Sequence, residues 1–172
     1  MKRDDEGYKG FVIARYPSLV RAAVLFGCNP QDAEDATQEA LIKCYRAWSR
    51  VTSADDPDAY VYRVLVNGIS RGRRRKWRGE LPHAEVPEQS TADPAVRVSV
   101  SHTVRESLRR LAPEQRQVLV LRYFADLTEN QIADILGIAP GTVKSRSSRA
   151  IATLAQDASL GELLLTRHEE DR

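Results

Sequence analysis

Cysteine and histidine are scarce in this sequence, which limits the chemistry that the chain can carry out. The two cysteines, Cys28 and Cys44, are too few for a disulfide framework and do not stand at metal-ligand spacing, so we expect reduced, buried thiols in a cytoplasmic protein. The three histidines, His83, His102 and His168, are scattered. Without a Cys/His cluster or a glycine-rich phosphate loop, the sequence predicts no enzyme, no metal or cofactor site and no small-molecule substrate.

Long hydrophobic runs are also missing. The longest apolar stretch, Ala22 to Cys28, is far below the roughly 20 residues that span a bilayer, and the charged start of the chain leads into no segment of signal-peptide length. We therefore expect no membrane insertion and a cytoplasmic location. Hydrophobic residues still make up 42% of the 172 residues, enough to bury a core. The net charge of +2 sums many charges of both signs, so their placement carries the information.

Apolar residues recur at helical spacing in two blocks. The sequence therefore predicts an all-α fold of two small helical domains, residues 1–79 and residues 102–172, the second containing a helix-turn-helix. Between them, residues 80–101 contain three of the eight prolines together with Ser, Thr and Glu, and they show no helical repeat. This composition predicts a flexible linker.

The first block is expected to form three helices. Pro17 marks a kink or a restart in the first helix. Asn29 and Pro30 suit the cap and the first position of the second helix. The polar run from Val51 to Pro57 predicts a loop, and the third helix follows from about Asp58. The expected inward-facing residues are Ala33, Ala36, Thr37, Ala40, Leu41, Cys44, Trp48, Val61, Val64, Leu65 and Ile69.

The second block carries the order of a helix-turn-helix between Leu127 and Leu154. Thr128 begins a Thr-x-x-Gln capping box, Gly137 is placed to end the short helix, and Pro140 is placed to start the longer one. The residues from Val118 to Leu121 alone could form a strand, but the helix signals on both sides favour a helix. The residues expected to pack inward are Ile132, Ala133, Leu136, Val143, Ala150 and Leu154.

The longer helix of this motif has the composition of a DNA-reading helix. It has no acidic residue from Thr142 to Gln156, and its expected outward side carries hydroxyls and cations. Phosphates attract such groups, and a carboxylate there would repel the DNA backbone. The alternative is an ordinary amphipathic helix with a basic, solvated face. The candidate DNA-contacting residues are Thr142, Lys144, Ser145, Arg146 and Arg149.

A second basic stretch lies between Ala59 and Gly79, with no acidic residue inside it. Tyr60, Tyr62 and Trp77 accompany the cations, and aromatic rings can stack on unpaired bases. A solvated tail or a targeting signal is the alternative, but the run continues an amphipathic helix, which favours a nucleic-acid surface. Its cations are Arg63, Arg71, Arg73, Arg74, Arg75, Lys76 and Arg78.

The helix from Pro30 to Trp48 has an acidic face, opposite in the sign of its charge to the two basic stretches. Its expected exposed residues are Asp32, Glu34, Asp35, Gln38 and Glu39. Two readings stay open on chemistry alone: carboxylates favoured by the helix dipole, or a docking face for a basic protein partner.

Three segments together resemble the extracytoplasmic-function class of sigma factors, which contain only regions two and four of the sigma-70 family. They are Asp32 to Ala40, Ala59 to Asn67 followed by the arginine cluster, and Ile132 to Arg146. A helix-turn-helix alone would be weak evidence, but three such segments in this order are specific. The resemblance covers nearly the whole chain outside the linker and about the last dozen residues.

The resemblance implies roles for the three segments. Asp35, Gln38 and Glu39 would dock on core RNA polymerase. Residues 51–57 would capture a base flipped from the −10 element, and the helix after them would border the melted strand. The helix-turn-helix would read the −35 duplex of promoter DNA, and the linker would pass near the polymerase cleft. The residues implied at the −10 strand are Asn67, Arg71, Arg74, Arg75 and Lys76.

Two positions depart from the family pattern, and two other functions compete. Ser147 stands where the family has an aliphatic residue on the inner side of the recognition helix, and Gly68 and Gly72 interrupt the basic helix. The first competing function is a sigma-like module that sequesters an anti-sigma factor without binding DNA, which would leave the basic surfaces unexplained. The second is a conventional helix-turn-helix regulator, which would leave the first block unexplained. An anti-sigma factor is also a candidate partner of a true sigma factor.

Overall fold

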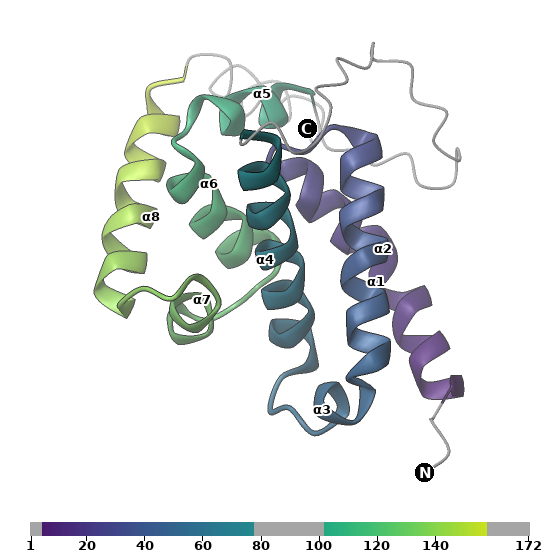
Figure 1. The fold of residues 1–172 in the computed structure, drawn as a ribbon. Helices are drawn as coiled ribbons and strands as arrows, with labels where there is room; N and C mark the ends of the chain where they lie inside the picture. Colours follow the sequence, from purple (N-terminus) through teal and green to yellow (C-terminus); the bar gives the residue numbers. More distant parts are fainter. Residues whose placement is uncertain (1–4, 78–101, 158–172) are drawn as a thin grey trace, which may run out of the picture. The chain divides into compact units, whose positions relative to one another are not determined.

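The computed structural model describes residues 5–77 and 102–157, with the side chains of residues 75–77 left undescribed. The predicted linker and the last residues lie outside these ranges. The described residues are helical and contain no strand, as predicted for an all-α chain (Figure 1). The chain divides into two compact units: the first holds α1 up to Val24 and α2 to α4, and the second holds α5 to α8.

The first unit is built around the packing of α2 (Pro30–Arg46) against α4 (Pro57–Trp77), with the short α3 (Trp48–Thr52) contacting both. Asn29 caps α2 as predicted, since its side chain accepts a hydrogen bond from the Asp32 amide at 2.8 Å. The residues with buried side chains include Ala33, Thr37, Ala40, Leu41 and Cys44 on α2 and Val61, Leu65, Val66 and Ile69 on α4. Ala36, Trp48 and Val64, also predicted to face inward, are only half-buried.

Helix α1 (Asp5–Leu25) is held to the other helices by aromatic and polar contacts. It runs unbroken through Pro17, so of the two predicted alternatives, a kink or a restart, the restart is wrong. Tyr8 packs its ring edge-on against Trp48, with centroids 5.3 Å apart, and donates a hydrogen bond to the Leu41 carbonyl at 2.9 Å. Burial raises the pKa of the Tyr8 phenol.

The loop predicted from Val51 to Pro57 is too long. Val51 is fully buried in α3, and α4 begins at Pro57, so only residues 53–56 connect the two helices. Asp56 starts α4 by accepting hydrogen bonds from the amides of Asp58 and Ala59, at 2.8 and 3.1 Å. The polar residues after Val51 made this stretch resemble a loop, so the sequence did not predict α3, a single helical turn whose buried residue is Val51.

The second unit begins with α5 (His102–Arg110) and α6 (Pro113–Leu119), and α6 continues into the π-helical turn η2 (Val120–Phe124). The residues from Val118 to Leu121 are therefore helical, as predicted. Helices α7 (Glu129–Leu136) and α8 (Pro140–Ala155) follow, and both α6 and α7 pack on α8. No helix within the described ranges combines the length and apolar character that a membrane crossing needs.

Candidate nucleic-acid and protein-binding surfaces

The turn between α7 and α8 is fixed by local backbone chemistry. Thr128 and Gln131 form the predicted capping box at the start of α7. Gly137 ends α7 in the left-handed conformation, with φ 66° and ψ 39°, which glycine adopts without a steric penalty. Ala139 is the cap residue before Pro140, which starts α8. The helix-turn-helix is thus present. On α7 the buried residues are Ile132, Ala133 and Ile135, whereas Leu136 is half-buried, so the prediction for Leu136 was one position off.

Helix α8 separates an apolar inner side from a polar outer side. Val143 and Ala150 are fully buried, as predicted, and Ser147 lies between them with 3% exposure, so this hydroxyl does sit on the inner side. Lys144 and Arg149 are exposed, while the other candidate DNA-contacting residues, Thr142, Ser145 and Arg146, are partly exposed. The Ser145 hydroxyl donates to the Thr142 carbonyl at 3.1 Å, which leaves its oxygen able to accept. The outer side can therefore offer cations and hydroxyls to a phosphate backbone.

Three of the four basic residues of α4 whose side chains are described lie on the side opposite its core contacts, and the fourth, Arg73, is only partly exposed. Arg63, Asn67, Arg71 and Arg74 are all exposed and follow one another at steps of four, four and three residues. Because a helix turns once in about 3.6 residues, this spacing places the four side chains in one row, which we call the α4 basic row. Arg75 and Lys76, the remaining candidates, lie outside the part of the chain whose side chains are described.

The two tyrosines of α4 have different environments. Tyr62 is 6% exposed, and burial raises the pKa of its phenol, so the expectation that it stacks on bases is wrong. Tyr60 is partly exposed and remains a candidate for stacking. Tyr62 shares the buried side of the helix with Val61, Leu65 and Ile69, a wider apolar side than the spacing alone predicted.

The candidate docking residues of α2 form one exposed surface. Asp35, Gln38 and Glu39, which we call the acidic surface, are all exposed on the side away from the buried residues. Gln31 donates to the Asp35 carboxylate at 3.2 Å, and Lys43 pairs with Glu39 at 2.6 Å, so both carboxylates have partners on α2 itself. Asp32 and Glu34 are only partly exposed. The acidic surface is suited to a partner that carries cations, and it would repel DNA.

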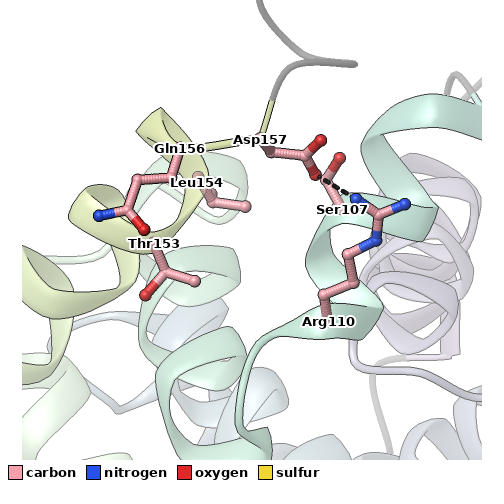
Figure 2. Close-up of a pocket in the computed structure, with 6 residues that line it drawn as sticks. All are labelled: Ser107, Arg110, Thr153, Leu154, Gln156 and Asp157. Atoms are coloured by element: carbon pink, nitrogen blue, oxygen red, sulfur yellow. Dashed lines mark hydrogen bonds and ion pairs between the residues drawn. The ribbon is translucent and has the colours of Figure 1, made fainter.

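The second unit also contains a small open pocket of about 160 Å³ between the ends of α5 and α8 (Figure 2). Arg110 and Asp157 bridge it with an ion pair of 3.1 Å. The buried Ser107 hydroxyl has no hydrogen-bond partner among the described residues.

Comparisons with known proteins agree with this geometry. Residues 11–79 match the family described as Sigma-70 region 2, and residues 101–154 match Sigma-70, region 4. The chain is 32% identical to RNA polymerase sigma-E factor of Streptomyces avermitilis, over 96% of this chain and 94% of the relative. It is 34% identical to ECF RNA polymerase sigma factor SigM of Mycobacterium tuberculosis, over 80% of this chain and 70% of the relative.

Two solved structures also resemble the fold. One is the sigma factor RpoE of Bartonella quintana in complex with the anti-sigma factor NepR, with a TM-score of 0.71, 26% identity and coverage of 87% of this chain and 94% of that one. The other is CnrH in complex with the cytosolic domain of CnrY, with a TM-score of 0.61, 23% identity and coverage of 88% of this chain and 87% of that one. The second likeness supports the fold alone.

Proposed function

The chain belongs to the sigma-70 family of RNA polymerase sigma factors, and we propose that it directs the polymerase to promoters by binding a −35 duplex through α8 and a melted −10 strand through α4. In this role it acts in the cytoplasm, and bond-making belongs to the polymerase. The observation that carries the proposal is the separation of charge by surface. The acidic surface lies on α2, whereas exposed cations lie on α4 and on the outer side of α8.

Reading of the −35 element is assigned to α8. Its apolar inner side fixes the helix on α6 and α7, which leaves Thr142, Lys144, Ser145, Arg146 and Arg149 for the major groove. The exposed Lys144 and Arg149 side chains can reach phosphates or base edges, and an arginine can bind a guanine with two hydrogen bonds. These contacts fix the register of the protein on the duplex.

Holding of the −10 strand is assigned to α4 and to residues 53–56. Asn67, Arg71, Arg74, Arg75 and Lys76 supply polar and cationic groups to the strand, and the short connection before α4 captures a flipped base. Unstacking a base costs a few kcal/mol, and pocket and stacking contacts can offset that cost. The fixed start of α4 at Asp56 gives the connection a rigid boundary.

Docking on core polymerase is assigned to Asp35, Gln38 and Glu39. Their surface lies on the opposite side of α2 from the helix contacts, so a partner can reach it without disturbing the core. Carboxylates that face a basic partner increase the association rate and fix the register.

Promoter-dependent run-off transcription tests the proposal. Purified core polymerase should produce defined transcripts only when this protein is added. Arg149→Ala should weaken binding to the −35 duplex, by roughly 1–3 kcal/mol with relaxed specificity at one base pair if the arginine contacts a base edge. Asp35→Asn should weaken polymerase binding and leave DNA binding by the isolated protein unchanged. Transcripts that begin at random sites in the presence of the protein would contradict the proposal.

An anti-sigma factor is proposed as a second partner. The observation that favours it is the likeness to the Bartonella quintana sigma factor, which was solved with an anti-sigma factor bound. Such a partner would compete with polymerase for this chain. Addition of the cognate anti-sigma protein to the run-off assay should abolish the transcripts, and excess core polymerase should restore them.

A further inference from the structure

A large apolar side chain lies uncovered on α2. Ile42 is 51% exposed, and the other strongly exposed large hydrophobic residues within the described ranges, Ile13, Tyr123 and Ile151, lie on other helices. Single exposed apolar residues are common on protein surfaces, so exposure alone assigns no role. The position of Ile42 next to the acidic surface is the second observation, and it points to a role in binding.

Ile42 lies in line with the acidic surface. It follows Asp35 by seven residues and Gln38 by four, and residues four or seven apart share one side of a helix. Side chains of a helix tilt toward its N-terminus, so Ile42 leans toward Gln38 and Glu39. The acidic surface therefore continues into an apolar patch at its C-terminal edge.

The core of the first unit does not depend on Ile42. Its chain neighbour Leu41 is 4% exposed, and with Ala40 and Cys44 it supplies the buried side of this turn. The carboxylates next to Ile42 are held by Gln31 and Lys43, which belong to the same helix. Truncation of Ile42 should therefore leave the fold intact, and an effect on binding would report on the partner.

We propose that Ile42 is the apolar anchor of the surface by which this chain docks on core RNA polymerase. This inference rests on the docking role proposed for Asp35, Gln38 and Glu39. Charged groups at the rim of an interface mainly set the association rate and the register, whereas an apolar side chain that loses its water inside a polar border contributes affinity. The polymerase surface that receives α2 should then contain an apolar recess bordered by lysine or arginine residues.

The test measures the dissociation constant of the full-length chain for purified core polymerase at low and high salt. Ile42→Ala removes three carbon atoms and should weaken binding roughly tenfold to fiftyfold. The weakening should persist at high salt, because salt screens charge pairs and not apolar contacts. Ile42→Leu should bind nearly as well as wild type. Ile13→Ala, at a 68% exposed site on α1, is the matched control and should bind like wild type.

The outcomes separate this inference from the docking role itself. If the wild-type chain does not bind core polymerase, the proposed function fails. If Asp35→Asn weakens binding but Ile42→Ala binds like wild type, or loses no more affinity than Ile13→Ala, the anchor role of Ile42 is overturned while the acidic surface keeps its role. Ile42→Gln is a second variant that should also weaken binding, and thermal unfolding of each variant establishes that the fold is intact.

Discussion

The guanidinium of Arg15 on α1 and the carboxylate of Asp58 on α4 form a two-point ion pair, with Nε–Oδ1 at 2.7 Å and Nη2–Oδ2 at 3.1 Å. The same guanidinium lies 5.1 Å from the centre of the Phe11 ring. The hydrogen bond to Asp58 raises the pKa of Arg15. The pair ties α1 to the first turn of α4, directly after the short connection that is assigned to base capture.

Replacement of Arg15 by lysine should weaken this link although the charge is kept, because an ammonium cannot make the planar two-point contact. The two side chains are 39% and 42% exposed, so solvent screening limits the expected loss in unfolding free energy to about 1 kcal/mol or less. Urea denaturation of Arg15→Lys, Asp58→Asn and the double variant measures the coupling. A coupling energy of zero at both low and high salt would show that the pair has no role in stability.

Thr37 buries a hydroxyl that has no partner among the described residues, at a side chain that is 0% exposed. Removal of a hydroxyl from water costs free energy, and a buried hydroxyl without a hydrogen-bond partner does not regain it. Thr37→Val should therefore raise the unfolding free energy by about 1 kcal/mol, as measured by urea denaturation. Thr37→Ser, which keeps the hydroxyl and removes the methyl group, is the control and should lower it. A destabilised valine variant would mean that the hydroxyl is bonded in solution.

The helix ends could be predicted from the sequence because their signals are local. Asn29, Thr128 and Gly137 satisfy backbone groups within a few residues of themselves, so the cap residues alone locate these ends. The Arg15–Asp58 pair joins positions 43 residues apart, and nothing in the neighbourhood of either residue indicates it. Local patterns also could not tell the buried Tyr62 from the partly exposed Tyr60.

The charges of the candidate surfaces could be predicted from composition, whereas the role of the acidic surface came only from the resemblance to a family. Lys144 and Arg149 are exposed on an acid-free helix, as composition indicated. The acidic surface left two readings open until its resemblance to sigma factors was considered. The sequence alone predicts no role for Ile42. Ile42 is adjacent to Leu41, and helical spacing indicates that one of two adjacent apolar residues is exposed, but not that the exposed one binds a partner.

Cys44 should make the fold sensitive to alkali. Burial raises its pKa from 9.0 to about 11. Below pH 9 the thiol is protonated in both states and the full stability is present. As the pH rises from 9 through 11, the unfolded chain loses the proton first, so the stability falls, by about 3 kcal/mol at most.

Urea denaturation at pH 8 to 11 measures this fall, and Cys44→Ala should show a shallower slope than wild type. Burial also raises the pKa of Tyr8 and Tyr62, but both tyrosines remain in the Cys44→Ala variant, so their contribution is common to both curves. Equal slopes for Cys44→Ala and wild type would contradict the assignment.

Gly68 and Gly72 should lower the stability of α4, and because they have no side chain they should leave room for a DNA strand beside the helix. A Cβ at Gly68 or Gly72 would meet no atom within 4 Å, so alanine fits at either site, and each replacement should raise the unfolding free energy by about 0.5–1 kcal/mol. Gly68 lies three residues before Arg71 of the α4 basic row, a spacing that makes the two positions neighbours on the helix surface, so a strand backbone approaching there would meet the added methyl group. Gly68→Ala should therefore stabilise the protein and reduce promoter opening, measured by permanganate reactivity of unpaired thymines.

Gly10→Ala on α1 is the matched control for this effect, since its Cβ also meets no atom within 4 Å and its helix lies outside the assigned DNA contacts. It should gain comparable stability and open promoters like wild type. If Gly68→Ala opens promoters as well as Gly10→Ala does, the strand does not approach α4 closely at Gly68. If neither variant gains stability, the open space around these glycines is filled in solution, and the expected stabilisation by alanine is contradicted.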